Sequence, residues 1–273
     1  MSSVINTNAK SVAAQNALVT NNRKLETAMQ QLSTGKRING AKDDAAGLSI
    51  ASKMTSYIKG LDQGVRNAND AISLLQTYEG AAVEIENMLQ RMRELAVQAA
   101  SDTNVTADRT AIDNETDALS LEITRIATDT KWNGTSLMSA ATTFTFHIGA
   151  DNATTSALTF VTTDLDATAL SVNAIDVSSN SAANLSIGTL TTALASVASA
   201  RSAAGAAINR LTYAADNLAN ISMNTQASRS RVQDTDYAKA TTELASRQII
   251  QQAATAMLAQ ANQEPQSVLS LLK

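Results

Sequence analysis

The chain has 273 residues, a net charge of −4, 17% charged side chains and only 3% aromatic ones. A compact globular core normally depends on bulky aromatic groups, so this composition argues against an ordinary globule, and the charge balance excludes the basic surface typical of nucleic-acid binding. Cysteine is absent, which excludes disulfide bonds and thiolate metal sites. A single proline, Pro265, and abundant alanine indicate a chain that is helical nearly throughout.

The N-terminal segment carries two sets of apolar residues spaced seven apart, namely Leu18, Leu25 and Leu32, and Ile5, Val12 and Val19. Polar residues recur every two or three positions, so we do not expect a secretory signal. No stretch of the chain approaches the ~20 apolar residues that a membrane-spanning helix needs, and we expect no membrane insertion.

A long helix is predicted from about Ala45 to Ala100. Its apolar residues recur at alternating steps of three and four, with a change of phase expected near Gly80; this spacing favours helices packed along one another. The adjacent carboxylates Asp43 and Asp44 precede this helix, in a loop that also contains Gly47. We expect the pair to cap the N-terminus of the helix, where carboxylates meet free N–H groups; a metal or acid site is the alternative.

A shorter helix follows the polar turn "SDTNVTAD" and ends at the turn signal Asn133-Gly134. Three-four spacing returns from Ile187 to Leu218, where Arg201 occupies the one position at which an apolar residue is expected. Near the C-terminus a last set steps four, three and four: Ile250, Ala254, Met257 and Ala261. A proline disfavours a helix interior, so we expect this last helix to end near Gln263 or Glu264.

The middle, residues 140–186, lacks helical periodicity and is rich in Thr, Ser, Asn and Asp. Alternating apolar residues on both sides of the turn "GADN" predict a β-hairpin: Phe144, Phe146 and Ile148, then Leu158 and Phe160. With helices before and after this insert, the fold class is mainly α. We expect a long antiparallel, coiled-coil-like hairpin of helices with terminal helices and the small β insert at its far tip.

The chain offers little for catalysis. His147, the lone histidine, is expected to be a surface residue of the hairpin, with no cysteine to pair with. "STGKR" lacks the glycine of a phosphate loop, because position 30 is Gln30, and "DLDATAL" lacks the glycine and closing glutamate of a calcium loop. We therefore expect no enzyme, no cofactor and no metal. Apolar stripes at both chain ends cannot be buried within one thin hairpin, which points to self-assembly.

Several long segments of the sequence resemble bacterial flagellin: "LSTGKRINGAKDDAAGLSIA" (32–51), "LQRMRELAVQAASDTN" (89–104), "WNG" (132–134), "FHIGADN" (146–152), "GAAINRL" (205–211) and "IIQQAATAMLAQANQEPQSVLSLLK" (249–273). The resemblance covers about residues 1–135 and 187–273 in order. It implies an extracellular filament subunit that is exported unfolded through the flagellum's own channel and polymerises at the distal tip, as the propeller for swimming.

The resemblance also implies a division of the chain. Residues 1–44 and 231–273 would form an inner core domain, disordered in the monomer; 45–139 and 187–230 would form a helical rod; and 140–186 would be a short, variable, β-rich outer region. Export through a pore fits a chain without disulfides. The expected partners are further copies of the chain, sibling flagellins, the flagellar export chaperone and export gate, and the hook-associated junction and cap proteins.

A C-terminal assembly tail is expected to be buried only by neighbouring subunits: Pro265, Val268, Leu269, Leu271 and Leu272. The segment "QRMRELAVQ" resembles the part of flagellin bound by the vertebrate flagellin-sensing Toll-like receptor. The matching positions are Arg91, Leu95 and Glu115, with Met92 in place of the usual valine. We expect Leu89, Met92 and Ala96 to face the helical core and Arg91 and Leu95 to lie on an outward flank that packs between subunits.

The middle region is dense in hydroxyls, and some flagellins are O-glycosylated in such regions. The candidate positions are Thr143, Thr145, Thr154, Thr155, Ser156, Thr159, Thr162, Ser171, Ser178, Ser179 and Ser181, with plain solvated turns as the alternative. Two other functions stay open. A hook–filament junction protein would share the flagellin ends, and a secreted membrane-active translocator would need a contiguous apolar helical hairpin that this sequence lacks.

Overall fold

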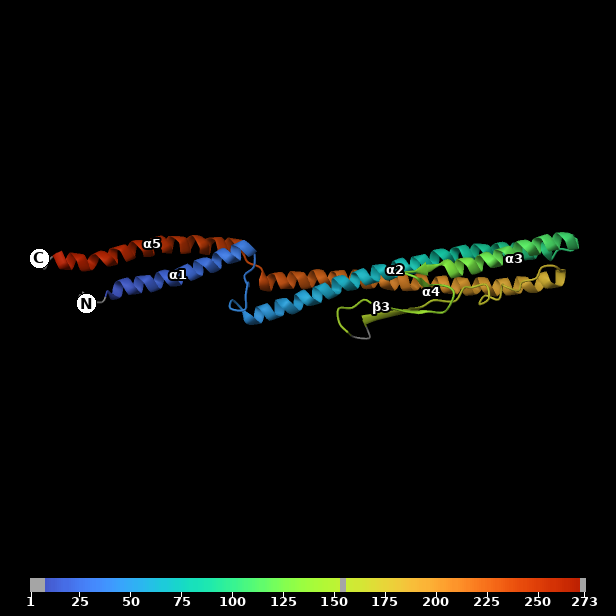
Figure 1. The fold of residues 1–273 in the computed structure, drawn as a ribbon, viewed down its shortest axis with the longest axis horizontal. Coiled ribbons are helices and arrows are strands. Elements are labelled where there is room, and N and C mark those ends of the chain that lie inside the picture. Colours follow the sequence, from blue (N-terminus) through green and yellow to red (C-terminus); the bar gives the residue numbers. More distant parts are fainter. Residues whose placement is uncertain (1–7, 153–155, 271–273) are drawn as a thin grey trace. The chain divides into compact units, whose positions relative to one another are not determined.

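A computed structural model describes residues 8–152 and 156–270 as a mainly helical chain with a small β insert, as predicted (Figure 1). The elements in chain order are α1 (Ala9–Thr34), α2 (Ala45–Ala99), α3 (Thr106–Asp129), β1 (Lys131–Trp132), β2 (Thr135–Ser136), β3 (Thr143–His147), β4 (Ala157–Val161), α4 (Asn180–Gln233) and α5 (Tyr237–Ser270). They form two compact units. The terminal unit comprises 1–56 and 224–273, and the central unit comprises 57–223.

The core of the central unit lies between α2, α3 and α4. Its buried positions on α2 step by three and four without interruption: Ala68, Ala71, Leu75, Tyr78, Ala82, Ile85, Leu89, Met92, Ala96 and Ala99. The heptad packing is therefore confirmed, but the change of phase expected near Gly80 is not there. It lies between Leu61 and Ala68, where the buried residue between them is Gly64.

Arg201 is polar at an otherwise apolar position because it bridges two helices of the central unit. Its guanidinium, on α4, forms ion pairs with Glu79 and Glu86 on α2, with Nη2 lying 2.8 Å from Glu79 Oε1. Side-chain exposure of these three residues is 34%, 36% and 22%, so the cluster is half-buried. Charges paired across two helices fix the register of one along the other.

The predicted β-hairpin is confirmed as β3 and β4, which pair antiparallel with Phe144 opposite Phe160. Alternation along the strands turns Phe144, Phe146, Leu158 and Phe160 toward the helical core and leaves the threonines between them exposed. The Phe160 ring meets Tyr78 of α2 edge to face, with ring centroids 5.9 Å apart. The three phenylalanines of this chain thus gather, together with Tyr78, where strands replace helix as the core partner.

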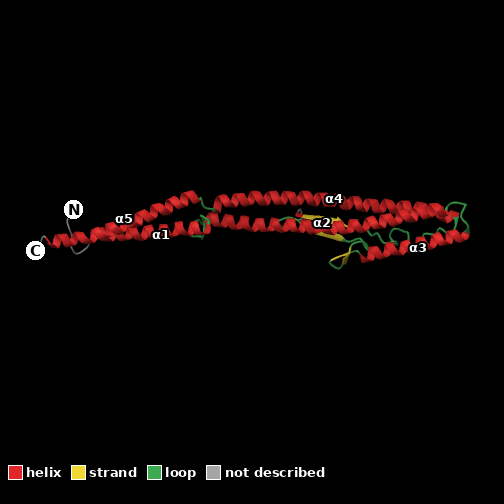
Figure 2. Cartoon of the chain, turned by 90° about the horizontal axis from the view of Figure 1, so that it is seen from above, coloured by secondary structure: helices red, strands yellow, loops and turns green. Residues whose placement is uncertain are grey.

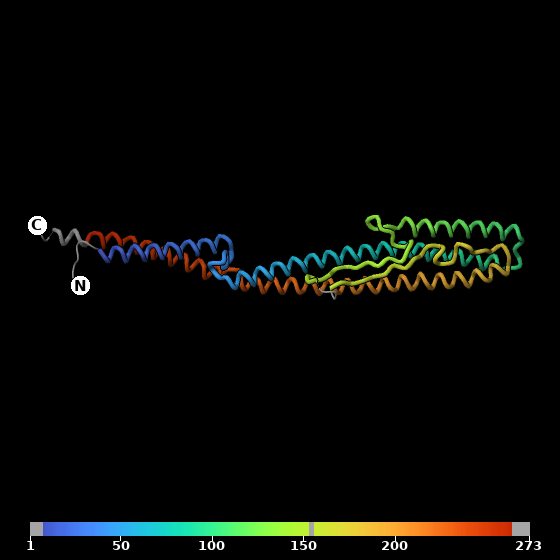
Figure 3. The backbone as a smooth tube through the Cα atoms, turned by 60° about the horizontal axis from the view of Figure 1, so that its bottom comes forward, coloured from blue at the N-terminus to red at the C-terminus, as the bar shows by residue number. Residues whose placement is uncertain are grey.

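The hairpin is not at a far tip, as the sequence suggested, but folds back along α2 (Figures 2 and 3). Asn67 of α2 donates a 2.8 Å hydrogen bond to the carbonyl of His147, which lies at the exposed end of β3. Gly60 and Gly64 permit this approach: a Cβ on Gly64 would lie 2.6 Å from the Ile148 carbonyl oxygen. α3 runs back along α2 and delivers the strands to this position, which no local pattern in the middle region reveals.

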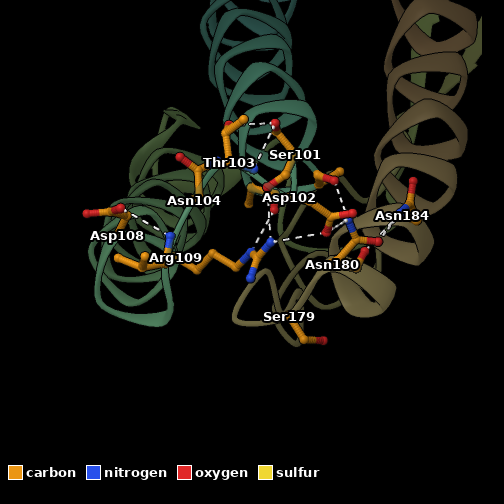
Figure 4. A network of polar contacts seen from close by, with 12 residues as sticks. Ser101, Asp102, Thr103, Asn104, Asp108, Arg109, Ser179, Asn180 and Asn184 are labelled. Atoms are coloured by element: carbon orange, nitrogen blue, oxygen red, sulfur yellow. Dashed lines mark hydrogen bonds and ion pairs between the residues drawn. The ribbon is translucent and has the colours of Figure 1, made fainter.

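The end of the central unit is formed by side chains that cap the C-terminus of α2 (Figure 4). Arg109 of α3 donates to the carbonyls of Ala99 and Ser101 at 2.9 and 3.0 Å, and Asn180 donates to the Ala100 carbonyl and to Asp102 Oδ1. The last carbonyls of a helix have no partner within it. No glycine follows α2 to end it with a left-handed cap, so residues of the two neighbouring helices supply the donors.

The other boundaries of the central unit largely follow the turn chemistry of the sequence. The Asn133-Gly134 turn joins β1 to β2 with both residues at positive φ, 47° and 82°. α4, in contrast, begins at Asn180 and not near 187 as predicted. The Ser179 hydroxyl accepts from the Ala182 N–H at 3.2 Å, an N-cap that lengthens the helix into a Ser- and Asn-rich segment without apolar spacing.

Candidate functional site

The terminal unit pairs α1 with α5 in antiparallel orientation (Figure 1). Inward positions at steps of three and four are buried or half-buried, and we call them the inner seam: Ser11, Ala14, Leu18, Asn21, Leu25, Ala28 and Leu32 on α1, and Ala240, Leu244, Arg247, Gln251, Ala254, Leu258 and Ala261 on α5. The expectation that the terminal stripes lack an intramolecular partner is wrong for the leucines of this seam. A sequence does not show that its two ends pair.

The inner seam is unusually polar. Asn21 is only 5% exposed, and its Nδ2 donates to the Arg247 carbonyl at 2.9 Å, while Gln251 Nε2 donates to Asn22 Oδ1 at 3.1 Å. Asn21 Oδ1 and Arg247 Nε are buried without a hydrogen-bond partner among the described residues. Polar groups at seam positions lower the stability of a helix pair but restrict its register and partner.

Outside the inner seam, the pair carries large apolar side chains that nothing in the described chain covers, and we call these positions together the outer face. Exposed fractions are 52% for Val12, 51% for Val19 and 55% for Met29 on α1, and 66%, 41% and 65% for Ile249, Ile250 and Met257 on α5. Val12 and Val19 belong to the second seven-residue set of the sequence, and Ile250 and Met257 to the C-terminal set. The two N-terminal sets therefore point in different directions, one into the seam and one outward, and the single C-terminal set is split, with Ala254 and Ala261 in the seam and Ile250 and Met257 outside it.

Threonine hydroxyls on α1 and α5 are satisfied within their own helix. Thr20, Thr27 and Thr34 each donate to the carbonyl four residues earlier at 2.8–3.0 Å. On α5, Thr241 and Thr242 do the same at 2.8 Å. Such hydroxyls need no further partner when a neighbouring molecule removes water from the helix surface.

The C-terminal helix continues through the proline, which contradicts the predicted end near Gln263 or Glu264. α5 extends to Ser270, five residues past Pro265. A proline removes a single N–H and crowds a single carbonyl, so a helix that is held by a partner can tolerate it. Of the predicted assembly tail, Leu271 and Leu272 lie outside the described residues, and so do the side chains of Pro265, Val268 and Leu269.

In the loop from Gly35 to Asp44, the two aspartates that were predicted to cap α2 together have different roles. Asp44 Oδ1 accepts from the Gly47 N–H at 2.8 Å and caps α2, as predicted. Asp43 instead accepts from the N–H groups of Asn39 and Gly40 at 3.1 and 3.0 Å and closes the turn before the cap. A side chain at position 47 would crowd this cap, because a Cβ on Gly47 would collide with the Asp44 carboxylate and lie 2.6 Å from Ile38 Cδ1.

The Arg91 patch is only partly as expected. Arg91 Nη2 lies 2.9 Å from Glu115 Oε1 of α3 in an exposed ion pair, and the Glu115 carboxylate raises the pKa of Arg91. Leu89, Met92 and Ala96 are fully buried, as predicted. Leu95, however, is 2% exposed and belongs to the core, not to an outward flank. The reason is that α3 covers a second side of α2, so the buried stripe is wider than one heptad seam.

The candidate glycosylation positions divide by exposure. Thr162 is 1% exposed, and its hydroxyl accepts at 3.0 Å from the N–H of Thr142, the residue before β3. This hydroxyl is therefore not available for modification. Thr154 and Thr155 lie outside the described residues, and Ser156 is half-buried. The exposed candidates are Thr143, Thr145, Thr159, Ser171, Ser178, Ser179 and Ser181.

The described residues contain no group of three or more His, Asp or Glu side chains that could hold a metal ion. Among the described helices, none is long and apolar enough to cross a membrane. Sequence analysis missed Arg109 and Asn180 at the end of the central unit and Asn8 and Asn21 in the terminal unit. The missing glycine cap after α2 was the available signal for the first pair.

Two family models match most of the chain. The bacterial flagellin N-terminal helical region matches residues 5–143, and the bacterial flagellin C-terminal helical region matches residues 187–272. The segment between the two matches contains most of the β3–β4 hairpin and the loop that leads into α4.

Relatives extend over the whole chain. A flagellin of Halalkalibacterium halodurans is 42% identical over 271 residues, covering 99% of this chain and 100% of that protein. Flagellin A of Vibrio anguillarum is 34% identical and covers 100% of both chains. The crystal structure of Bacillus cereus flagellin aligns with 56% of this chain and 88% of its own at 32% identity, with a TM-score of 0.51.

Proposed function

Since this chain belongs to the bacterial flagellin family, it is a structural subunit of the flagellar filament that serves swimming motility, and we propose that the outer face of α1 and α5 is the surface through which its copies pack. The hook–filament junction alternative is not favoured by these relatives. The observation that supports the proposal is a set of large apolar side chains left uncovered on a helix pair whose seam is already occupied.

The free energy that burial of these side chains can contribute is large enough to favour assembly. Full burial of one valine, isoleucine or methionine contributes ~1.5–3 kcal/mol, so the half-exposed residues Val12, Val19, Met29, Ile249, Ile250 and Met257 together offer several kcal/mol per subunit. In a helical homopolymer every subunit repeats this gain. A free chain with such a face is prone to associate, which is a function and not a defect in a protein that polymerises.

The C-terminal tail extends the same surface in our proposal. Deleting residues 265–273 removes Val268, Leu269, Leu271 and Leu272. We expect the truncated monomer to keep the helices of its central unit, as measured by circular dichroism, and to fail to elongate filament seeds. Normal filaments from the truncated chain would contradict the role of the tail.

The five-part division of the chain is also a proposal, with 1–44 and 231–273 ordered only on assembly. A polar seam contributes little to the stability of an isolated helix pair, which supports this. Proteolysis of the monomer should cut before about Ser33 and after about Arg231 and spare the residues between, and filaments should protect all of them. Equal resistance of the ends in both states would contradict it.

Export and recognition complete the proposal. A chain without cysteine cannot be cross-linked by disulfides, which suits export of the unfolded chain to the cell exterior with a flagellar chaperone and export gate, and assembly against the hook-associated junction and cap proteins. Sibling flagellins would share the same outer face.

For recognition by a Toll-like receptor, Arg91 and Glu115 are the accessible residues, whereas buried Leu95 would act through the packing of α2. O-linked sugars would attach to the exposed candidates.

The test of the outer face compares two variants at one exposed position. Val19→Asp places a charge on the outer face, and Val19→Ile keeps it apolar. We expect both monomers to give the circular dichroism spectrum of the unmodified chain, and only Val19→Ile to elongate seeds at a normal rate. If Val19→Asp elongates equally well, the outer face of α1 is solvated in the filament and the proposal is wrong.

A further inference from the structure

The only proline of the chain lies inside a helix, since α5 continues from Tyr237 to Ser270. In an α-helix the N–H of each residue donates to the carbonyl four positions earlier, so residue 265 would serve the carbonyl of Ala261. Proline has no N–H. The carbonyl of Ala261 therefore lacks its helical donor because of the covalent structure of Pro265.

A side chain from the other end of the sequence takes the place of that donor. Asn8 Nδ2 donates to the Ala261 carbonyl oxygen at 2.7 Å. Asn8 is also the N-cap of α1, where its Oδ1 accepts from the Ser11 N–H at 3.1 Å. A single amide thus satisfies an acceptor that proline leaves free in α5 and one of the free donors at the start of α1.

A second contact accompanies the first. The Ser11 hydroxyl, 8% exposed, donates to Asn262 Oδ1 at 2.9 Å, one residue along from Ala261. Ala261 itself is 8% exposed and closes the inner seam at this end. Two neighbouring polar contacts therefore join the first turn of α1 to the turn of α5 that precedes Pro265.

We propose that Pro265 and Asn8 form a register lock, in which the proline frees one carbonyl of α5 and the N-cap amide of α1 recognises it, so that the first turn of α1 pairs with α5 of its own chain at this position. A shift by one helical turn would bring Asn8 opposite a carbonyl that already has its helical donor. The lock uses the only proline in the chain, so α5 offers no second position of this kind. Residues 8–11 and 261–265 consequently order together.

The lock concerns pairing within one chain and depends on the proposed function only in that filaments are the state in which it is measured. The test is a double-mutant cycle. Asn8→Asp keeps an N-cap acceptor of the same shape but removes the Nδ2 donor. Pro265→Ala restores the N–H that serves Ala261. The measured quantity is the rate at which subunits dissociate from the filament on dilution.

We expect Asn8→Asp to accelerate dissociation by about 5-fold or more with Pro265 in place, the equivalent of one lost hydrogen bond. In the Pro265→Ala background the same change should alter the rate by less than ~2-fold, because Ala261 then has a helical donor. Asn8→Ser, which also caps but is too short to reach Ala261, should follow Asn8→Asp. An equal effect of the Asn8 variants in both backgrounds would overturn the lock.

Cross-linking tests the same pairing of α1 with α5 without a substitution at Asn8. The chain has no cysteine, so Ser11→Cys with Asn262→Cys introduces the only two thiols. We expect mild oxidation of filaments to join them within one chain, giving a monomer of altered electrophoretic mobility. The matched control, Gln15→Cys with Asn262→Cys, moves one thiol by one helical turn and should link at least ~5-fold less.

Disulfide-linked dimers from the Ser11 and Asn262 pair, or equal yields from the Gln15 control, would show that α1 pairs with another chain or without a fixed register, and would overturn the proposal. These outcomes are separate from failure of the outer face. Elongation by Val19→Asp would refute the assembly role of that face and leave both the cycle and the cross-links interpretable.

Discussion

The α1–α5 pair and the α2–α4 pair share one spacing of inward residues but differ in what occupies it. On α2 the buried positions include Leu75, Ile85, Leu89 and Met92, all fully buried. In the α1–α5 seam, the buried positions include Ser11 and Asn21, the seam leucines are only half-buried, and further large apolar side chains lie outside the seam. The difference teaches that heptad spacing indicates a helix pair, whereas the chemistry at its inward positions indicates whether that pair is complete in one chain.

The polar residues of the two pairs differ in the same way. In the central unit Arg201 has both of its carboxylate partners within the same chain. In the terminal unit Asn21 Oδ1 and Arg247 Nε have no hydrogen-bond partner in the described part of the chain. Buried polar groups without partners lower stability, so the terminal pair is the weaker of the two.

The strongest way to break this comparison is to place the same charge in each unit. Leu95→Asp puts a carboxylate into the core of the central unit, where the leucine is 2% exposed. We expect it to lower the free energy of unfolding by ~4 kcal/mol or more, because it adds an unpaired buried charge to the loss of apolar contacts. Val19→Asp on the outer face should change monomer stability by less than ~0.5 kcal/mol.

Urea denaturation of both monomers, followed by circular dichroism, measures this difference directly. Leu95→Asp should also abolish filaments, but as a consequence of unfolding. A Leu95→Asp monomer of unchanged stability would show that Leu95 lies on an outward flank and not in the core.

Removing Arg201 tests whether the central pair depends on its polar bridge. Arg201→Met keeps the length of the side chain and leaves Glu79 and Glu86 without their shared cation. We expect a loss of about 1–2 kcal/mol in unfolding free energy, between the values for exposed and buried ion pairs. Arg210→Met on the exposed side of α4 is the matched control and should be nearly neutral. Equal effects of the two changes would show that the bridge contributes nothing specific.

Two glycines of α2 sharpen the comparison within a single helix. A Cβ at Gly64 would lie 2.6 Å from the Ile148 carbonyl, whereas a Cβ at Gly80 meets nothing within 4 Å. Gly80→Ala should stabilise the monomer by about 0.5–1 kcal/mol through helix propensity. Gly64→Ala has the same gain but must displace the hairpin backbone, and we expect a net loss of about 1 kcal/mol. If both alanines stabilise equally, the hairpin does not pack against α2.

Tyr78 gives an effect no larger than that of Gly64→Ala and adds a dependence on pH. Burial raises the pKa of its phenol. The phenol donates to the Thr163 carbonyl at 3.4 Å and accepts from the Thr163 N–H at 3.3 Å. A raised pKa means that the folded chain holds this proton more tightly than the unfolded chain. The contribution of Tyr78 to the stability of the folded chain is therefore complete below the ordinary tyrosine pKa of about 10. It is lost as pH rises through the pKa that Tyr78 has in the folded chain.

Tyr78→Phe should cost about 1 kcal/mol at neutral pH, the typical contribution of a hydrogen bond. It should also remove the part of the alkaline destabilisation that this phenol causes. Unfolding free energies at pH 8 and pH 11, compared between the two proteins, check both statements. An identical decline with pH in both would assign the alkaline effect to other groups that titrate in this range, the remaining tyrosines and the lysines.

Much of the fold could be predicted from the sequence because helix and hairpin signals are local. The three-four spacing along α2 and the alternation around Phe144 and Phe160 identified both kinds of element. The adjacent aspartates before α2 identified its cap. What could not be predicted depends on contacts between distant segments. The direction of Leu95 depends on α3 covering α2, and the position of the hairpin depends on Gly60 and Gly64.

The candidate site was predictable in kind but not in detail. Spaced apolar residues at both chain ends indicated assembly, yet the sequence did not show which of its two N-terminal sets, the one with Leu18 or the one with Val19, faces a helix of the same chain. That assignment appears only when α1 is paired with α5. Pro265 was misinterpreted for a related reason: its local effect is to end a helix, whereas here its missing N–H is answered by a side chain from the opposite end of the chain.

The threonine hydroxyls of α1 and α5 have a consequence for how neighbouring chains fit. A hydroxyl that already donates to its own helix, as in Thr20, Thr241 and Thr242, has no proton left for a directional bond to another molecule. Its oxygen can still accept, but in our proposal the methyl group and the neighbouring apolar side chains make the contact with the next subunit. Contacts of that kind set how closely two helices approach but discriminate weakly between positions along the axis. A subunit that slid along these threonines would therefore break no hydrogen bond that they donate.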